Sequence, residues 1–215
     1  RQNLGLKTLY DLCKINSQPS TFDLGFLLGP RINAGGRVGK SSHGAELLTS
    51  EDPLKAYKLA VDLDKFNTER KSIEVLLTED VNKQVEKFKN DSVIVLSGNN
   101  WHEGIIGIVA SRIKDKYNKA VVLISMNDQI GKGSARSVFG FDIGANIIQG
   151  VQSNILRSGG GHKMAGGFVI EKKNIDLFRN FLLQNFKKTK IKNSDSPSLL
   201  VDTIIAPSAL NEDFY

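Results

Sequence analysis

Residues 157–168 read RSGGGHKMAGGF, with five glycines inside nine residues. These glycines surround His162 and Lys163 and run into an apolar sequence at 168–170 that is typical of a strand. Because glycine lacks a Cβ, its backbone can approach a ligand closely and adopt positive φ at little cost. Exposed N–H groups of such a loop can bind an anion, to which the histidine or lysine would add a donor. The same composition also fits a tight turn whose histidine satisfies a nearby carbonyl.

The bulk composition is that of a soluble globular protein with a basic bias. The 215 residues suffice for one large domain or two small ones, and the net charge of +6 favours a polyanionic partner. The single Cys13 excludes an internal disulfide, and no cysteine cluster could hold zinc. No apolar run is long enough to span a bilayer, and no signal peptide opens the sequence, so we expect a cytoplasmic protein without a membrane partner.

A compact α/β domain is predicted from about residue 90 to 190. Apolar runs bounded by turn residues indicate buried strands, and they alternate with segments of helical periodicity. Such alternation is typical of α/β domains. The predicted strands are 92–97, 120–125, 130–137 and 167–171, and the predicted helices are 105–113, 141–150 and 174–188.

A long helix is predicted before this domain. Asp52 is a suitable N-cap, and Pro53 suits the first helical position. Apolar residues then recur with helical spacing to about Phe88, without a further glycine or proline. Such a helix could be a stiff spacer between two lobes or an ordinary core helix, and its length favours the spacer. A shorter helix is predicted for residues 4–15.

A second glycine-rich stretch occupies residues 29–39, which read GPRINAGGRVG. We expect a loop in which Arg31 and Arg37 flank an asparagine and two glycines. Guanidinium groups offer a planar fork of donors that suits phosphate oxygens, and glycine lets a polymer come close. The stretch also fits a helix C-cap with exposed arginines.

The C-terminal residues carry a linker signal followed by a strand signal. Residues 187–198 are rich in Lys, Asn and Ser, which is typical of a linker. The apolar run at 199–205 predicts a strand. The remaining residues are too few to fold as a domain of their own.

Taken in order, the motifs at 29–37, 101–112, 132–137 and 160–167 resemble those of the RecJ family, single-stranded-DNA-specific exonucleases of the DHH phosphoesterase superfamily. The Gly-Gly-His motif by itself indicates only the superfamily's substrate-binding module, DHHA1. The Arg-Ile-Asn-Ala and Trp-His segments point to RecJ. The resemblance implies four segments, namely the C-terminal remnant of a DHH catalytic domain at 1–50, a connecting helix at 51–89, a DHHA1 domain at 90–190, and a linker with the first strand of an OB-like domain at 191–215.

In that family two lobes form a cleft for single-stranded DNA, and Asp and Asp-His-His motifs of the N-terminal lobe bind Mn²⁺ or Mg²⁺. This sequence has no Asp-His-His, and its three histidines are isolated. The resemblance therefore implies a chain without metal ligands that supplies the nucleic-acid-binding wall of the cleft, together with an N-terminal DHH lobe of the same protein. The activity implied for the whole protein is 5′→3′ hydrolysis of single-stranded DNA in repair and recombination.

The resemblance also implies which residues face the substrate. Arg31 and Arg37 would lie near the scissile or terminal phosphate, and Ser134 and Arg136 would bind phosphate from the other lobe. His162 would stabilise developing charge as a supporting catalytic residue. Trp101 would stack a base, although a core position suits it equally. The complete predicted substrate-binding set is Arg31, Asn33, Arg37, Trp101, His102, Ser134, Arg136, Ser137, Gly160, Gly161 and His162.

Three other functions fit parts of the sequence. A DHHA1 module can bind nucleic acid without hydrolysis, as in alanyl-tRNA synthetase, but the stretch at 29–39 argues against this. A phosphodiesterase for short oligonucleotides or cyclic dinucleotides is a second alternative, against which residues 199–215 argue. A nucleotide-binding α/β protein is the third, and the sequence lacks its Gly-x-Gly-x-x-Gly fingerprint.

Overall fold

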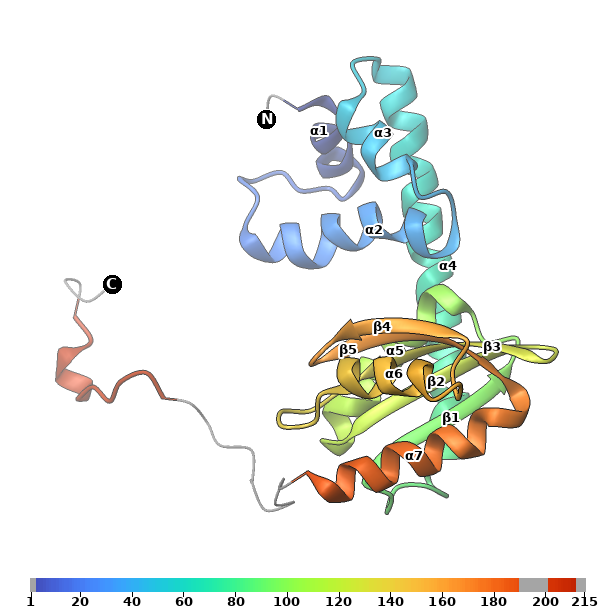
Figure 1. The fold of residues 1–215 in the computed structure, drawn as a ribbon. Coiled ribbons are helices and arrows are strands. Elements are labelled where there is room, and N and C mark those ends of the chain that lie inside the picture. The colour runs from blue at the N-terminus through green and yellow to red at the C-terminus, as the bar shows by residue number, and fades with distance from the viewer. Residues whose placement is uncertain (1–2, 190–200, 212–215) are drawn as a thin grey trace.

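The computed structural model describes residues 3–189 and 201–211. It has an N-terminal lobe of helices and a C-terminal α/β lobe, and a single long helix runs through both (Figure 1). The N-terminal lobe contains α1 (Leu4–Leu12), a π-helical segment η1 (Asp23–Leu28), α2 (Gly29–Val38) and α3 (His43–Thr49). None of the helices within the described ranges is both long and apolar enough to cross a membrane.

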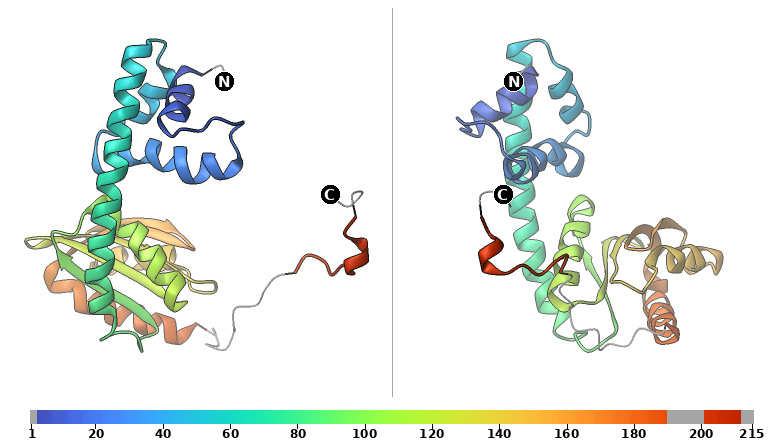
Figure 2. Two further views of the ribbon diagram at one scale, coloured as in Figure 1. Left: turned by 180° about the vertical axis from the view of Figure 1, so that it is seen from behind. Right: turned by 90° about the vertical axis from the view of Figure 1, so that its left-hand side faces the viewer.

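Helix α4 (Pro53–Val85) confirms the long helix predicted for residues 52–88. The Asp52 side chain accepts a hydrogen bond from the Leu54 N–H at 2.9 Å, so the predicted cap is present. With 33 residues, the helix is about 50 Å long. Leu59 and Leu63 pack in the N-terminal core, whereas Leu77, Val81 and Val85 pack against the sheet of the other lobe. The helix is therefore a spacer that also belongs to two cores (Figure 2).

The C-terminal lobe contains a five-stranded sheet in the order β1-β2-β3-β5-β4. Strands β1 and β2 are parallel and joined by α5, while the other neighbours are antiparallel. These elements confirm the predicted α/β fold. The strands are β1 (Val93–Asn99), β2 (Ala120–Asn127), β3 (Ile130–Arg136), β4 (Ser158–His162) and β5 (Ala165–Glu171), and the helices are α5 (Glu103–Tyr117), α6 (Ile143–Gln152) and α7 (Ile175–Lys188).

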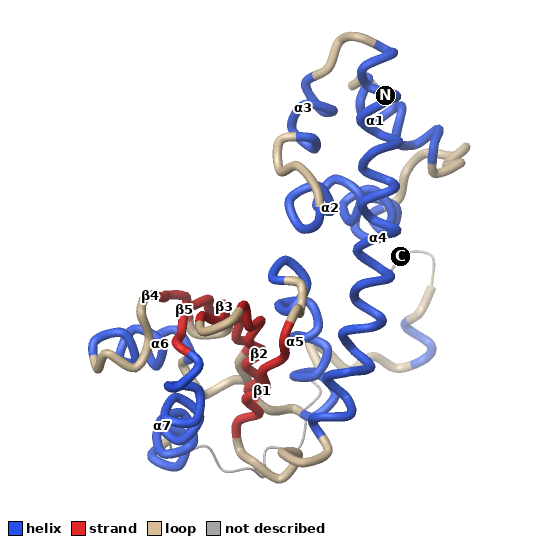
Figure 3. The backbone as a smooth tube through the Cα atoms, turned by 90° about the vertical axis from the view of Figure 1, so that its right-hand side faces the viewer, coloured by secondary structure: helices blue, strands red, loops and turns tan. Residues whose placement is uncertain are grey.

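The helices cover the two faces of the sheet unequally. On one face α6 and α7 bury a core that includes Phe141, Phe168 and Phe178. On the other face α4 and α5 cover β1 and β2, and α5 reaches β3 (Figure 3). The described helices leave this second face of β5 and β4 open. The open strands lie on the side of the lobe that is turned toward α2 (Figures 1 and 3).

The prediction of a loop at residues 29–39 was wrong, because Gly29–Val38 forms helix α2. Pro30 lies in its first turn, where a missing N–H is harmless. Ala34 and Gly35 are buried, and a Cβ on Gly35 would lie only 3.1 Å from the Leu63 side chain of α4. Small residues thus let α2 pack closely on α4, and this packing outweighs the poor helix propensity of glycine.

Two other local predictions also need correction. The stretch 157–168 is a β-hairpin rather than a loop, since β4 and β5 pair across it. The strand predicted at 199–205 is not formed at 201–205, which are exposed and without regular structure, and 199–200 lie outside the described residues. A strand requires a pairing partner as well as apolar β-branched sequence.

Candidate nucleic-acid interface

On the open face of the sheet, β3 presents polar side chains beside the glycine-rich strands β5 and β4. Side chains alternate along β3, so Lys132, Ser134 and Arg136 share the face that β5 and β4 leave open. Ser134 lies opposite Gly167, which in turn lies opposite Gly160. In the next row Arg136 lies opposite Ala165, and Ala165 opposite His162. A ligand on this face would meet hydroxyl and guanidinium groups on β3 and bare backbone on the neighbouring strands.

Arg136 is held in place next to Ser134. Its Nη1 donates to Ser134 Oγ at 3.2 Å and to the Ala135 carbonyl at 2.8 Å. Both side chains pack over Gly107 of α5, where an added Cβ would lie 2.9 Å from each. Burial lowers the pKa of the Arg136 guanidinium, and the charge of Arg37 lowers it further, but an arginine remains charged at neutral pH. No carboxylate in the described part of the chain forms an ion pair with it. The group is therefore suited to an external anion.

Arg37 brings a second cation to this place from the N-terminal lobe. It lies near the end of α2, and its Nη1 donates to the Gly104 carbonyl in the first turn of α5 at 3.1 Å. A Cβ on Gly104 would lie 2.3 Å from the Arg37 carbonyl oxygen, so the two helices touch through their backbones. The fold thus brings Arg37, Ser134 and Arg136 together from positions about a hundred residues apart.

A hollow of about 450 Å³ continues the polar strand away from Arg136. Glu103 and Ile106 of α5 line one side, Lys132 and Ser134 lie on β3, and Gly167 contributes bare backbone. Its size and its mixture of polar and apolar walls suit part of a nucleotide.

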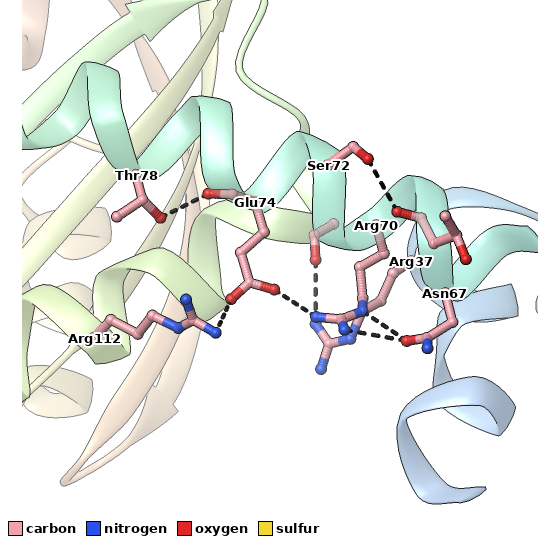
Figure 4. A network of polar contacts seen from close by, with 9 residues as sticks. Arg37, Asn67, Arg70, Ser72, Glu74, Thr78 and Arg112 are labelled. Carbon is pink, nitrogen blue, oxygen red and sulfur yellow. Dashed lines mark hydrogen bonds and ion pairs between the residues drawn. The ribbon is translucent and has the colours of Figure 1, made fainter. Parts of the chain in front are cut away.

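An ionic network around the buried Glu74 joins α4 to α5 near Arg37 (Figure 4). Glu74 of α4 is only 2% exposed, and it pairs with Arg112 of α5 and accepts from Arg70 Nη1 at 2.5 Å. Arg70 also donates to Asn67 Oδ1 through Nε at 3.2 Å. The network ties α5 to α4 next to Arg37, and therefore fixes the helix over which Ser134 and Arg136 pack.

Comparison with known proteins identifies the family. Residues 90–188 match the DHHA1 domain. The chain is 37% identical over 191 residues to the single-stranded-DNA-specific exonuclease RecJ of Haemophilus influenzae, and 32% identical over 216 residues to that of Escherichia coli. These alignments cover 84% and 96% of this chain. The chain belongs to the RecJ family.

The fold supports the same assignment. The crystal structure of Thermus thermophilus RecJ in complex with Mg²⁺ superposes with a TM-score of 0.74 at 27% identity, covering 86% of this chain and 28% of that one. The complex with Mn²⁺ gives a TM-score of 0.75. The chain spans about a third of the length of the two curated RecJ relatives, 33% and 37%.

Arg31 of α2 bonds to α4 and to the adjoining segment η1. Its side chain is 18% exposed, and its Nε pairs with Asp64 of α4 at 2.8 Å while Nη1 donates to the Leu27 carbonyl at 2.8 Å. The charge of Arg31 thus anchors α2 on α4, and its contact with the substrate stays a prediction. Asn33 lies exposed on α2.

Three further predicted site residues have structural roles. Trp101 is 7% exposed, and its indole N–H donates to Asp80 at 2.7 Å, so its ring is not accessible to a base. Ser137 is buried and donates to the Phe141 carbonyl at 2.6 Å. His102 is the N-cap of α5, and its Nδ1 accepts from the Gly104 N–H at 3.2 Å. In this structure the core interpretation of Trp101 holds, and the stacking interpretation does not.

The hairpin residues differ from one another in access. His162 is exposed at the turn, where its Nδ1 accepts from the Met164 N–H at 3.3 Å. A Cβ on Gly160 would meet no heavy atom within 4 Å, whereas one on Gly161 would lie 2.3 Å from the Ala165 carbonyl oxygen. Gly160 therefore leaves open space above its Cα on the open face, whereas the absent side chain of Gly161 makes room for the Ala165 carbonyl of the paired strand. The binding role of both glycines stays a prediction.

Sequence reasoning missed Lys132 and Glu103 as parts of the site. Both line the hollow, and they form an ion pair at 2.7 Å. The signal was present for Lys132, because the alternation of glycine or alanine with Lys132, Ser134 and Arg136 places all three on one face. Glu103 had no comparable signal, since its distance to β3 depends on how α5 packs.

The residues present do not fit a catalytic metal centre. Within the described ranges, no three histidine, cysteine, aspartate or glutamate side chains lie close enough to hold a metal ion. The arrangement supplies cations, hydroxyls and bare backbone, which are groups suited to binding an anionic polymer.

Proposed function

We propose that this chain supplies one wall of the single-stranded-DNA cleft of a RecJ-type 5′→3′ exonuclease that acts in DNA repair and recombination. The observation that carries the proposal is the convergence of Arg37, Ser134 and Arg136 beside the open glycines of β5 and β4. The guanidinium groups would bind phosphate, and the strand would come close to the backbone at Gly160 and Gly167.

The role of these residues is to hold the strand. Binding through phosphates is independent of sequence, which suits an enzyme that degrades any single strand. Contributions from both lobes would fix the direction in which the strand lies, and positioning of this kind lowers the barrier to hydrolysis. His162, exposed at the end of the Arg136 row, would contact the same strand.

Hydrolysis would require groups beyond those described. The relatives from Thermus thermophilus were solved with Mg²⁺ and Mn²⁺, and we propose that such ions are bound by a DHH lobe that acts together with this chain. The chain alone would then bind single-stranded DNA without hydrolysing it. The position of Arg37 next to Arg136 favours this arrangement over a DHHA1 module that acts separately as a nucleic-acid-binding appendage.

Fluorescence anisotropy of labelled oligonucleotides tests the proposal. The chain should bind an oligothymidylate more tightly than a blunt duplex of the same length, and its affinity should fall steeply with salt. With Mn²⁺ or Mg²⁺ added, it should release no nucleotides. Equal affinity for the duplex, or steady metal-dependent hydrolysis abolished by a substitution in this chain, would contradict the proposal.

A further inference from the structure

We propose that Glu103 acts as a length-dependent gate on the DNA-binding face, because it holds Lys132 away from the strand until the strand is long enough to displace it. The inference rests on the proposed function and names a specificity-determining residue of the same site. The juxtaposition that carries it is the Glu103–Lys132 ion pair on the hollow that continues the Ser134 and Arg136 row.

The geometry of β3 makes Lys132 the next contact for a bound strand. Residues two apart in a strand are separated by about 6.8 Å. Lys132, Ser134 and Arg136 therefore follow one another at equal steps along one face, and this repeat is comparable to the spacing of phosphates in an extended single strand. A short oligonucleotide gripped at Arg136 and Ser134 would end before Lys132, whereas a longer one would cover it.

Glu103 neutralises the positive charge of Lys132, the third contact along β3. Its carboxylate pairs with the Lys132 ammonium at 2.7 Å, and the side chains are 50% and 58% exposed. Glu103 lies in the first turn of α5, where the helix N-terminus favours a negative charge. The hollow therefore has almost no net charge at its far end, although β3 alone would place a cation there.

The ion pair between Glu103 and Lys132 can open at a small cost in free energy. Exposed ion pairs contribute little to stability because water and salt screen them. A phosphate entering the hollow would compete with Glu103 for Lys132 and would be repelled by the free carboxylate. Glu103 thus weakens the binding of long strands selectively, and so favours release as the strand moves through the cleft.

Glu103→Gln tests this in the full chain by anisotropy with oligothymidylates of two, four and twelve nucleotides over a range of NaCl concentrations. We expect the twelve-nucleotide strand to bind at least about threefold more tightly, with a salt slope steeper by about 0.7. Binding of the dinucleotide should not change. Lys132→Ala should weaken binding of the long strand, and the double variant should lose the gain.

Glu86→Gln is the matched control. Glu86 also forms an exposed ion pair, with Lys89 at 2.8 Å, but it lies at the end of α4 away from the hollow. The Glu86→Gln variant should bind strands of all three lengths with the affinity of the unaltered chain. Unchanged or weaker binding of the long strand by Glu103→Gln would overturn the gate, even if Arg136→Ala still weakens binding as the proposed function requires. If the unaltered chain bound no single strand and Arg136→Ala had no effect, both the proposed function and the gate would be overturned.

Discussion

Gly160 of β4 lies directly opposite Gly167 of β5, and Gly167 lies opposite Ser134 of β3. A Cβ on Gly160 would enter open space, and one on Gly167 would meet only the Gly133 carbonyl oxygen, at 3.7 Å. The backbone is thus accessible beside the hydroxyl and guanidinium groups of β3. This relationship separates the glycines at which a side chain would fill the open face from Gly161, at which it would collide with the paired strand.

Gly160→Val and Gly161→Val should therefore have different effects. Valine at 160 is compatible with a strand and meets no atoms, so the melting temperature should change little, while single-strand affinity should fall at least about threefold. Valine at 161 would collide with the Ala165 carbonyl and should destabilise the fold by more than about 2 kcal/mol. Circular dichroism melts and anisotropy measure the two effects. Equal destabilisation by both substitutions would contradict the assignment.

The buried carboxylate at the lobe junction should be important for stability. Glu74→Ala leaves Arg70, whose side chain is 12% exposed, without its acidic partner. Removal of one member of a buried pair typically costs about 3 kcal/mol or more. Urea unfolding should show this loss, whereas Glu86→Ala at an exposed pair should stay within about 0.5 kcal/mol. A similar effect of the two substitutions would mean that the network does not hold α5 on α4.

The thiol of Cys13 should react slowly. Burial raises the pKa of this thiol above its ordinary value, and the nearby Asp64 adds to the effect against the opposing charge of Arg31. A raised pKa keeps the thiol protonated at neutral pH, and only the thiolate is nucleophilic. Alkylation by iodoacetamide at pH 7.5 should therefore be several times slower in the folded chain than in urea. Equal rates would show that the thiol is accessible and not perturbed.

Much of the α/β lobe could be predicted because its strands are apolar runs bounded by turn residues. The long helix could also be predicted, from the N-cap Asp52, from Pro53 and from apolar residues that recur at helical spacing without interruption. The errors arose where tertiary contacts override local preference. Glycines indicated loops at 29–39 and 157–168, but packing on α4 makes the first a helix, and the pairing of β4 with β5 makes the second a hairpin.

The site was predictable only in part for a related reason. The order of residues on β3 is sufficient to place Ser134 and Arg136 on one face. The positions of Arg31 and Trp101 depend on partners that are distant in sequence. Arg31 bonds to Asp64, 33 residues away, and Trp101 bonds to Asp80, 21 residues away. No local pattern indicates such pairs. An arginine in a phosphate-binding loop and an arginine that anchors a helix have the same sequence signature.

The salt dependence of single-strand binding by Arg136→Ala tests the central claim most directly. Anisotropy titrations of an oligothymidylate at several NaCl concentrations should show lower affinity and a salt slope reduced by about 0.7, because one phosphate contact is lost. Lys187→Ala is the control, since Lys187 is exposed on α7, which covers the opposite face of the sheet. It should leave both quantities nearly unchanged. If Lys187→Ala reduced affinity and slope as much as Arg136→Ala, binding would reflect diffuse positive charge, and the phosphate site on β3 would be contradicted.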